Sequence, residues 1–281
     1  MFVDTPDGTS IYYEVNGSGP PLLLIAGTGC DHLWWSLQVE DLAQDFTVIT
    51  CNSRGSGRST IYPNVEDYSS EVMADDMAAL VRHLDLGPVH VVGHSLGSCI
   101  AQQLAIRHPD LVLSAQLHAT WSHADEWLKR AFIETMAYPT RLGDAHSAWK
   151  TVGMWIFSPQ YLEERTPAHV AAAVSSAFVT NPHLDNHHGL LGHLHADRFH
   201  DTREQLHSIS VPTLVTAGEL DVSFPPRYGF DVYERIPGAR WHLFTGPRAA
   251  HAFNLEMSHE FNELVRDFAR QSNPAVVPHR Q

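Results

Sequence analysis

The 281-residue sequence predicts an α/β fold in which helices flank a mostly parallel central sheet. Short, continuous apolar runs recur along the chain, and such runs are typical of strands that are buried on both faces of a parallel sheet. Stretches with apolar residues at helical spacing separate these runs. The strand pattern stops near residue 120 and resumes near residue 211, which predicts that helices are inserted late in the sheet.

The strands are predicted from the apolar runs and from the turn residues that end them. A turn at Asp7-Gly8 separates a strand over residues 1–3 from a second strand over residues 10–15. The remaining strands are expected over residues 22–26, 46–50, 89–92, 111–117, 211–216 and 239–244.

The helices are predicted from apolar periodicity and capping residues. Ser69 or Ser70 can cap a helix that ends at Leu84. The helices of the core are expected over residues 69–84, 95–108, 227–236 and 257–270, and those of the insertion over residues 124–136, 145–157, 159–178 and 182–195. We therefore expect an α/β core over residues 1–120 and 207–270, a helical lid over residues 121–206 and a flexible tail over residues 271–281.

The charge balance argues against polyanionic partners. The chain has 18 basic and 32 acidic side chains and a formal net charge of −14. Its only lysines are Lys129 and Lys150, and neither lies in a basic run. Without a basic cluster to displace counterions from phosphates, we expect the protein to bind neither nucleic acid nor anionic membranes.

The cysteines and the N-terminus indicate a cytoplasmic location. Cys30, Cys51 and Cys99 are odd in number and share no metal-ligand spacing, so we expect reduced, buried thiols. No signal peptide precedes the first strand, and no apolar run approaches the roughly 18 residues of a membrane span. The sequence leaves the oligomeric state open, and a homodimer is one alternative.

The segment Gly93-His94-Ser95-Leu96-Gly97 fits the G-x-S-x-G pattern of a nucleophile elbow. It follows a predicted buried strand and opens a predicted helix, which is the context that this chemistry requires. A serine in a strained strand-to-helix turn needs small neighbours two residues before and after it, and the helix N-terminus then stabilises negative charge beside it. We predict that Ser95 is a nucleophile and that His94 is structural.

A general base and an orienting acid follow Ser95 in the order that the elbow requires. Asp221 comes just after the next-to-last predicted strand, and His251 follows the last strand and its loop. An aspartate past the carboxyl end of a strand lies on the same rim as the serine. His251 can then take the serine proton while Asp221 orients its ring. Glu219 is the alternative acid, and His242 is expected to pack within its strand.

This ordered set of motifs resembles the α/β-hydrolase superfamily over nearly the whole chain. The resemblance rests on residues 27–29, 52–59, 93–97, 212–221, 237–240 and 251–256. It implies an oxyanion hole formed by the backbone N–H groups of Leu96 and Thr28. It also implies that the turn at residues 54–59 is structural. Ser95 separates the chain from members that resemble haloalkane dehalogenases and epoxide hydrolases, which need a carboxylate at this position.

The residues around His251 resemble one subgroup of this superfamily. Residues 250–254 resemble those of 3-oxoadipate enol-lactonases and aminoacrylate hydrolases, which are small cytoplasmic catabolic enzymes. Asn254 stands three residues after His251, which is similar to their His-x-x-Asn arrangement. The resemblance implies a small-molecule ester or enol-lactone as the substrate and no cofactor.

The insertion is expected to form a lid that lines an apolar pocket over Ser95. It carries Trp121, Trp127, Trp149 and Trp155 among its aromatic residues. We select Trp121, Trp127, Trp155 and Asn254 as pocket candidates, and the alternative for each tryptophan is simple packing of the lid on the core.

Two histidines of the insertion raise the question of a metal. His183 and His187 have the i, i+4 spacing that can share a metal ion on a helix. No glutamate follows His183 directly, and serine chemistry requires no metal, so we expect a solvated helix face and no metal site.

The motifs favour a serine hydrolase of a carboxylic ester or lactone over two alternatives. The first alternative is a hydrolase of carbon–carbon bonds of the meta-cleavage product type. The second is a hydrolase fold used as a small-molecule receptor or cyclase, and the complete set of Ser95, Asp221 and His251 argues against a pure binder.

Overall fold

The computed structural model describes residues 1–164 and 187–272, which contain an eight-stranded sheet in the order β1-β2-β4-β3-β5-β6-β7-β8. The strands are β1 Phe2–Asp4, β2 Ser10–Asn16, β3 Pro21–Ile25, β4 Thr47–Cys51, β5 Val89–His94, β6 Val112–His118, β7 Thr213–Gly218 and β8 Arg240–Phe244. The pairs β1/β2 and β2/β4 are antiparallel, and all other neighbours are parallel. The mostly parallel sheet expected from the sequence is therefore confirmed.

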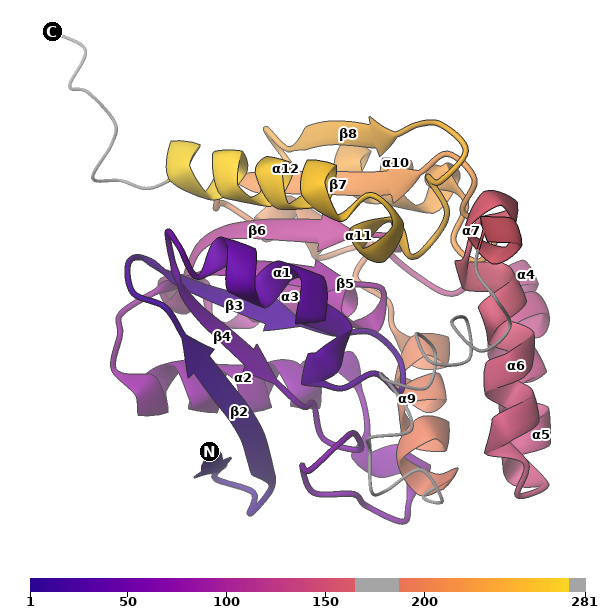
Figure 1. Ribbon diagram of the computed structural model, residues 1–281. Helices are drawn as coiled ribbons and strands as arrows, with labels where there is room; N and C mark the ends of the chain where they lie inside the picture. Colours follow the sequence, from indigo (N-terminus) through magenta and orange to yellow (C-terminus); the bar gives the residue numbers. More distant parts are fainter. Residues whose placement is uncertain (165–186, 273–281) are drawn as a thin grey trace, which may run out of the picture.

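Helices cover both faces of this sheet, which explains why its strands are continuous apolar runs. Every residue of β5 and β7 is buried. Helices α1 Ser36–Leu42 and α12 Ser258–Gln271 pack on one face, and α2 Ser70–Leu84, α3 Leu96–Arg107 and α10 Pro226–Arg235 pack on the other (Figure 1). The burial of both faces agrees with a parallel sheet. In the described part of the chain, no helix combines the length and apolar character required to cross a bilayer.

A helical segment lies between β6 and β7, as the interrupted strand pattern predicts. Its described helices are α4 Glu126–Leu128, α5 Glu134–Arg141, α6 Ala145–Ile156, α7 Pro159–Glu164 and α9 His187–Phe199. We call these the inserted helices, and they stand beyond the carboxyl ends of the parallel strands (Figure 1). The two ends of the segment meet, because His123 and Asp201 form an antiparallel bridge and Thr202 N–H donates to Ser122 O at 2.8 Å.

The inserted helices differ in extent from the sequence expectation. A π-helical stretch, Lys129–Ile133, joins α4 to α5, and the helix continues past the expected end at Met136 to Arg141 with Pro139 inside it. The helix expected over residues 159–178 is described only as α7. The helix expected over residues 182–195 is described only from His187, and it continues to Phe199, with Ala196 and Asp197 of its last turn buried.

A buried ion pair fixes the loop after β4 to α2. The Arg54 guanidinium donates to both carboxylate oxygens of Asp76 at 2.6 Å and to Asp7 Oδ2 at 2.8 Å. The side chains of Arg54 and Asp76 are only 3% and 2% exposed. Bidentate geometry offsets the cost of removing two charges from water, and a partner left alone would be a buried, uncompensated charge.

We predict that Asp76→Asn lowers the free energy of unfolding by about 3 kcal/mol, because it leaves the buried guanidinium of Arg54 with only the half-exposed carboxylate of Asp7 as a charged partner. Urea denaturation followed by circular dichroism measures the loss. Asp75→Asn is the matched control, since Asp75 is 45% exposed and pairs with Arg107 at the surface. That variant should lose less than about 1 kcal/mol, and equal losses in the two variants would contradict the prediction.

Candidate active site

Ser95 occupies a sharp turn between β5 and α3. Its backbone has φ 55° and ψ −127°, a region that residues with a side chain rarely adopt. Two glycines make the turn sterically feasible. A Cβ on Gly93 would collide with the carbonyl group of Gly97, and a Cβ on Gly97 would collide with the carbonyl oxygen of Ile25. The Ser95 N–H donates to His118 O at 2.9 Å, which ties the turn to the end of β6.

Asp221 and His251 are brought together at the carboxyl ends of β7 and β8. Asp221 Oδ2 lies 2.7 Å from His251 Nδ1, and both side chains are buried. The other carboxylate oxygen, Asp221 Oδ1, accepts the backbone N–H groups of Ser223 and Phe224 at 2.9 and 2.8 Å. These bonds fix the carboxylate, which in turn fixes the orientation of the imidazole.

The two alternatives weighed in the sequence lie elsewhere. Glu219 is exposed, and its carboxylate accepts the N–H of Gly246 at 3.2 Å. His242 lies inside β8 and packs its ring against Phe244 at 4.7 Å. Neither residue lines the pocket beside Ser95.

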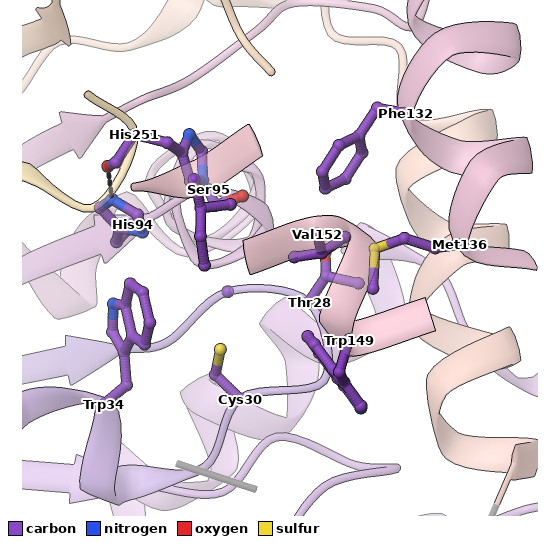
Figure 2. A pocket seen from close by; sticks show the side chains of 12 residues that line it. Thr28, Cys30, Trp34, His94, Ser95, Phe132, Met136, Trp149, Val152 and His251 are labelled. Carbon is purple, nitrogen blue, oxygen red and sulfur yellow. Dashed lines mark hydrogen bonds between the residues drawn. The ribbon is translucent and has the colours of Figure 1, made fainter. Parts of the chain in front are cut away.

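Aromatic rings surround the imidazole of His251. The Phe224 ring lies 5.2 Å and the His94 ring 4.9 Å from it. Burial, and then the proximity of His251, hold the pKa of His94 well below its usual range. A neutral His94 donates from Nε2 to the carbonyl oxygen of His251 at 3.0 Å, so it supports this loop without adding a charge (Figure 2).

The loop Gly27–Cys30, which follows β3, lies against Ser95. We call it the oxyanion loop after its expected role. A Cβ on Gly27 would lie 2.9 Å from Ser95 Cβ, so only glycine permits this approach. Within the described residues, the backbone N–H groups of Thr28 and Leu96 donate to no other group. Both groups therefore remain able to donate a hydrogen bond to a bound oxygen atom.

A pocket opens at Ser95 and His251. Figure 2 shows Phe132 and Met136 facing Ser95 from the inserted helices, with Trp34 below it. The lining side chains are mainly apolar, and those within the described residues are Gly27, Thr28, Cys30, Trp34, His94, Ser95, Phe132, Met136, Trp149, Val152, Ile156 and His251. No lysine or arginine is among them.

The four residues selected as pocket candidates lie outside this lining. Trp121 is fully buried and stacks on Phe224 at 4.2 Å, so it supports the ring behind His251. Trp127 is 41% exposed at the surface, and Trp155 contributes a carbonyl oxygen that accepts Ser223 Oγ at 3.2 Å. Asn254 is fully buried in α11 Phe253–Glu256. The burial of Trp121 matches the packing alternative.

The residues that do form the apolar wall come from one face of α6 and from the helix before it. Trp149, Val152 and Ile156 recur at i, i+3 and i+7 along α6. Phe132 and Met136 stand one turn apart. This helical stripe was visible in the sequence, but the choice of large tryptophans over periodic positions missed it.

The histidines considered for a metal are only partly described. His183 lies outside the described residues, and His187 begins α9. Within residues 1–164 and 187–272, no group of three His, Cys, Asp or Glu side chains is arranged to hold a metal ion.

Comparisons with known proteins identify the family to which this chain belongs. A model of the α/β-hydrolase fold matches residues 20–255. The chain is 30% identical over 258 residues to an Azorhizobium caulinodans protein named as a carbamate hydrolase, RutD, with 92% of this chain and 94% of that protein covered.

Two solved structures share the fold. The enol-lactonase from Burkholderia xenovorans has a TM-score of 0.85 and 25% identity and covers 95% of this chain and 99% of its own. A thermophilic esterase from Thermogutta terrifontis has a TM-score of 0.82 and 25% identity and covers 97% of this chain and 98% of its own. With the family model spanning the chain from β3 to α11, this protein belongs to the α/β-hydrolase family.

Proposed function

We propose that this protein is a serine hydrolase that cleaves a carboxylic ester or lactone, with Ser95, His251 and Asp221 as its catalytic residues. The supporting observation is the 2.7 Å contact between Asp221 and His251 Nδ1, next to a pocket that both Ser95 and His251 line. A carboxylate on Nδ1 keeps the proton there and leaves Nε2 free to act as a base.

In the first half of the reaction, Ser95 Oγ attacks the carbonyl carbon of the substrate while His251 Nε2 takes the hydroxyl proton. Asp221 stabilises the imidazolium that forms. The carbonyl oxygen becomes an oxyanion, which accepts the free N–H groups of Thr28 and Leu96. His251 then gives its proton to the leaving alkoxide, and the acyl group stays on Ser95.

In the second half, water attacks the acyl-enzyme. His251 removes a proton from the water, the tetrahedral intermediate forms again in the oxyanion hole, and its collapse returns the proton to Ser95 Oγ. The products are a carboxylic acid and an alcohol. In a lactone both groups belong to one molecule.

The pocket supports a small substrate with an uncharged, apolar acyl group. Its wall of aromatic and aliphatic side chains matches an alkyl or ring substituent, and no lysine or arginine among the described lining residues would pair with a carboxylate. The similarity to an enol-lactonase and an esterase supports carbon–oxygen bonds as the target. Carbamate cleavage is a second candidate, which the identity to RutD supports, because the same attack on a carbonyl carbon would serve it.

We place this activity in the cytoplasm. Cys30, Cys51 and Cys99 are all buried free thiols, as a reducing compartment would maintain them.

We predict that Ser95→Ala lowers kcat/KM for p-nitrophenyl butyrate by at least about 10⁴-fold, because no other group can form the acyl-enzyme. His251→Ala should cost a similar factor. The measurement is the initial rate of p-nitrophenolate release, together with labelling of Ser95 by a fluorophosphonate.

Glu219→Gln is the matched control for Asp221→Asn. Both carboxylates follow β7, but only that of Asp221 contacts His251. Asp221→Asn should lower kcat by about 10⁴-fold by reversing the imidazole tautomer, whereas Glu219→Gln should stay within about threefold of wild type. A wild-type protein that neither hydrolyses an ester, lactone or carbamate panel nor reacts with the fluorophosphonate would refute the proposal and favour a receptor.

We further predict that the protein prefers p-nitrophenyl butyrate over mono-p-nitrophenyl succinate by about 100-fold or more in kcat/KM. The two acyl chains are of similar length, but the succinate must bury a carboxylate among apolar side chains at a cost of several kcal/mol. Parallel rate measurements at low ionic strength decide the matter. Equal rates for the two esters would show that the acyl group does not occupy the apolar wall.

A further inference from the structure

Helix α9 packs directly on the loops that surround the active site. Gly189 meets the backbone of Gly55 so closely that a Cβ at residue 189 would collide with the Gly55 carbonyl oxygen. One turn later, a Cβ on Gly192 would collide with the ring of Tyr68. Two glycines on one face therefore bring the helix backbone into contact with the core.

The same face of α9 carries two polar side chains that bind the oxyanion loop. Asp197 Oδ2 accepts the hydroxyl of Thr28 at 2.7 Å, and His193 Nδ1 accepts the backbone N–H of Gly29 at 2.9 Å. His193 and Asp197 are one helical turn apart, and they are 1% and 0% exposed. Their partners are consecutive residues, and Thr28 follows Gly27, the residue of this loop that approaches Ser95, and lines the same pocket.

His193 also connects the loop to the buried ion pair of the core. Because Nδ1 accepts a hydrogen bond, the ring proton lies on Nε2, which donates to Arg54 O at 2.7 Å. Burial lowers the pKa of His193 to about 4, consistent with this neutral form. Arg54 is held in turn by Asp76. A continuous series of hydrogen bonds therefore runs from α2 through His193 to Gly29.

The end of α9 is attached to the core as well. His200 Nδ1 contacts Ser70 Oγ at 2.8 Å, and Thr202 Oγ1 donates to Gln102 Oε1 at 2.6 Å. The chain is therefore attached to the core both before Asp197, at residues 189–193, and after it, at residues 200–202. The second oxygen of Asp197, Oδ1, accepts no hydrogen bond from the part of the chain that the structure describes, and burial raises the pKa of this carboxyl to about 7.

We propose that Asp197 and His193 are positioning residues that aim the Thr28 N–H at the carbonyl oxygen of the substrate. The inserted helices would then set the geometry of the oxyanion hole in addition to lining the pocket. This inference rests on the proposed serine hydrolase function. Loss of these contacts should weaken the stabilisation of the transition state and leave substrate binding unchanged, because the oxyanion exists only after attack.

Two variants remove the contact from opposite sides. Thr28→Val deletes the hydroxyl but keeps the backbone N–H, and Asp197→Leu deletes the acceptor. Each should lower kcat for p-nitrophenyl butyrate by about 10–100-fold, somewhat less than the loss of an oxyanion donor itself, with KM within about threefold of wild type. Asp197→Asn keeps an acceptor oxygen of the same shape and should restore kcat to within about threefold.

The double variant Thr28→Val/Asp197→Leu should be no slower than the slower single variant, since both changes break one hydrogen bond. Asp201→Asn is the control, because Asp201 lies four residues further along at the surface and pairs with Arg203. It should leave kcat unchanged.

Inhibition by a boronic acid distinguishes a loss of oxyanion-hole positioning from a general structural defect. Butylboronic acid accepts an electron pair from Ser95 Oγ while the hydroxyl proton passes to His251, which gives a tetrahedral anion. Its inhibition constant should rise in each variant by the same factor as kcat/KM falls, whereas inhibition by neutral butyramide should not change. A merely structural defect would weaken both inhibitors or neither.

Amide hydrogen exchange tests the loop independently of any substrate. Asp197→Leu should raise the exchange rate of the Gly29 amide by at least about tenfold, because the loop opens more often. Unchanged exchange together with unchanged kcat would overturn the inference. Failure of the proposed function would appear in the wild-type protein as a lack of Ser95 labelling, and the exchange measurement would still report whether α9 holds the loop.

Discussion

The candidate active site depends on one constraint, the positive φ angle of Ser95. This conformation costs about 1–3 kcal/mol, and it fits here because glycines stand where side chains would collide with the turn. Glycine at residues 93 and 97 lets α3 begin directly against the ends of β5 and β3. Gly27 lets the next loop approach Ser95. One strained residue therefore brings a hydroxyl, the N-terminus of α3 and the loop after β3 to the same place.

The parallel sheet brings the other two residues, Asp221 and His251, to the same edge as Ser95. His94 at the end of β5 pairs with His118 of β6, and His118 pairs with Thr216 of β7. Because these strands end in register, the loops that follow β7 and β8 leave the sheet beside Ser95. Asp221 and His251 lie in those loops, so residues more than one hundred positions from the serine need only short loops to reach it.

The sequence was informative where chemistry imposes local patterns. The elbow, the buried strands and the two loops of Asp221 and His251 could be predicted, because each has a required spacing or a required neighbour. The pocket wall could not be chosen by size alone. Trp121 and Trp149 are equally large, yet the first is buried behind Phe224 and the second faces the pocket. That difference is decided by how helices pack on one another.

The role of α9 was hidden for the same reason. A histidine in a His-rich stretch suggests a metal or a solvated face, and nothing local shows that residue 193 points at the backbone of Gly29. The two glycines at residues 189 and 192 are the physical cause, since they remove the spacing that side chains would impose between helix and core. Because the backbones are in close contact, the His193 side chain reaches the amide of Gly29. Such packing holds the loop rigid, and electrostatic catalysis requires rigid donors. Substitutions on the pocket face of α6 should therefore change substrate preference without changing the proposed oxyanion hole, as long as Gly189, Gly192, His193 and Asp197 of α9 are kept.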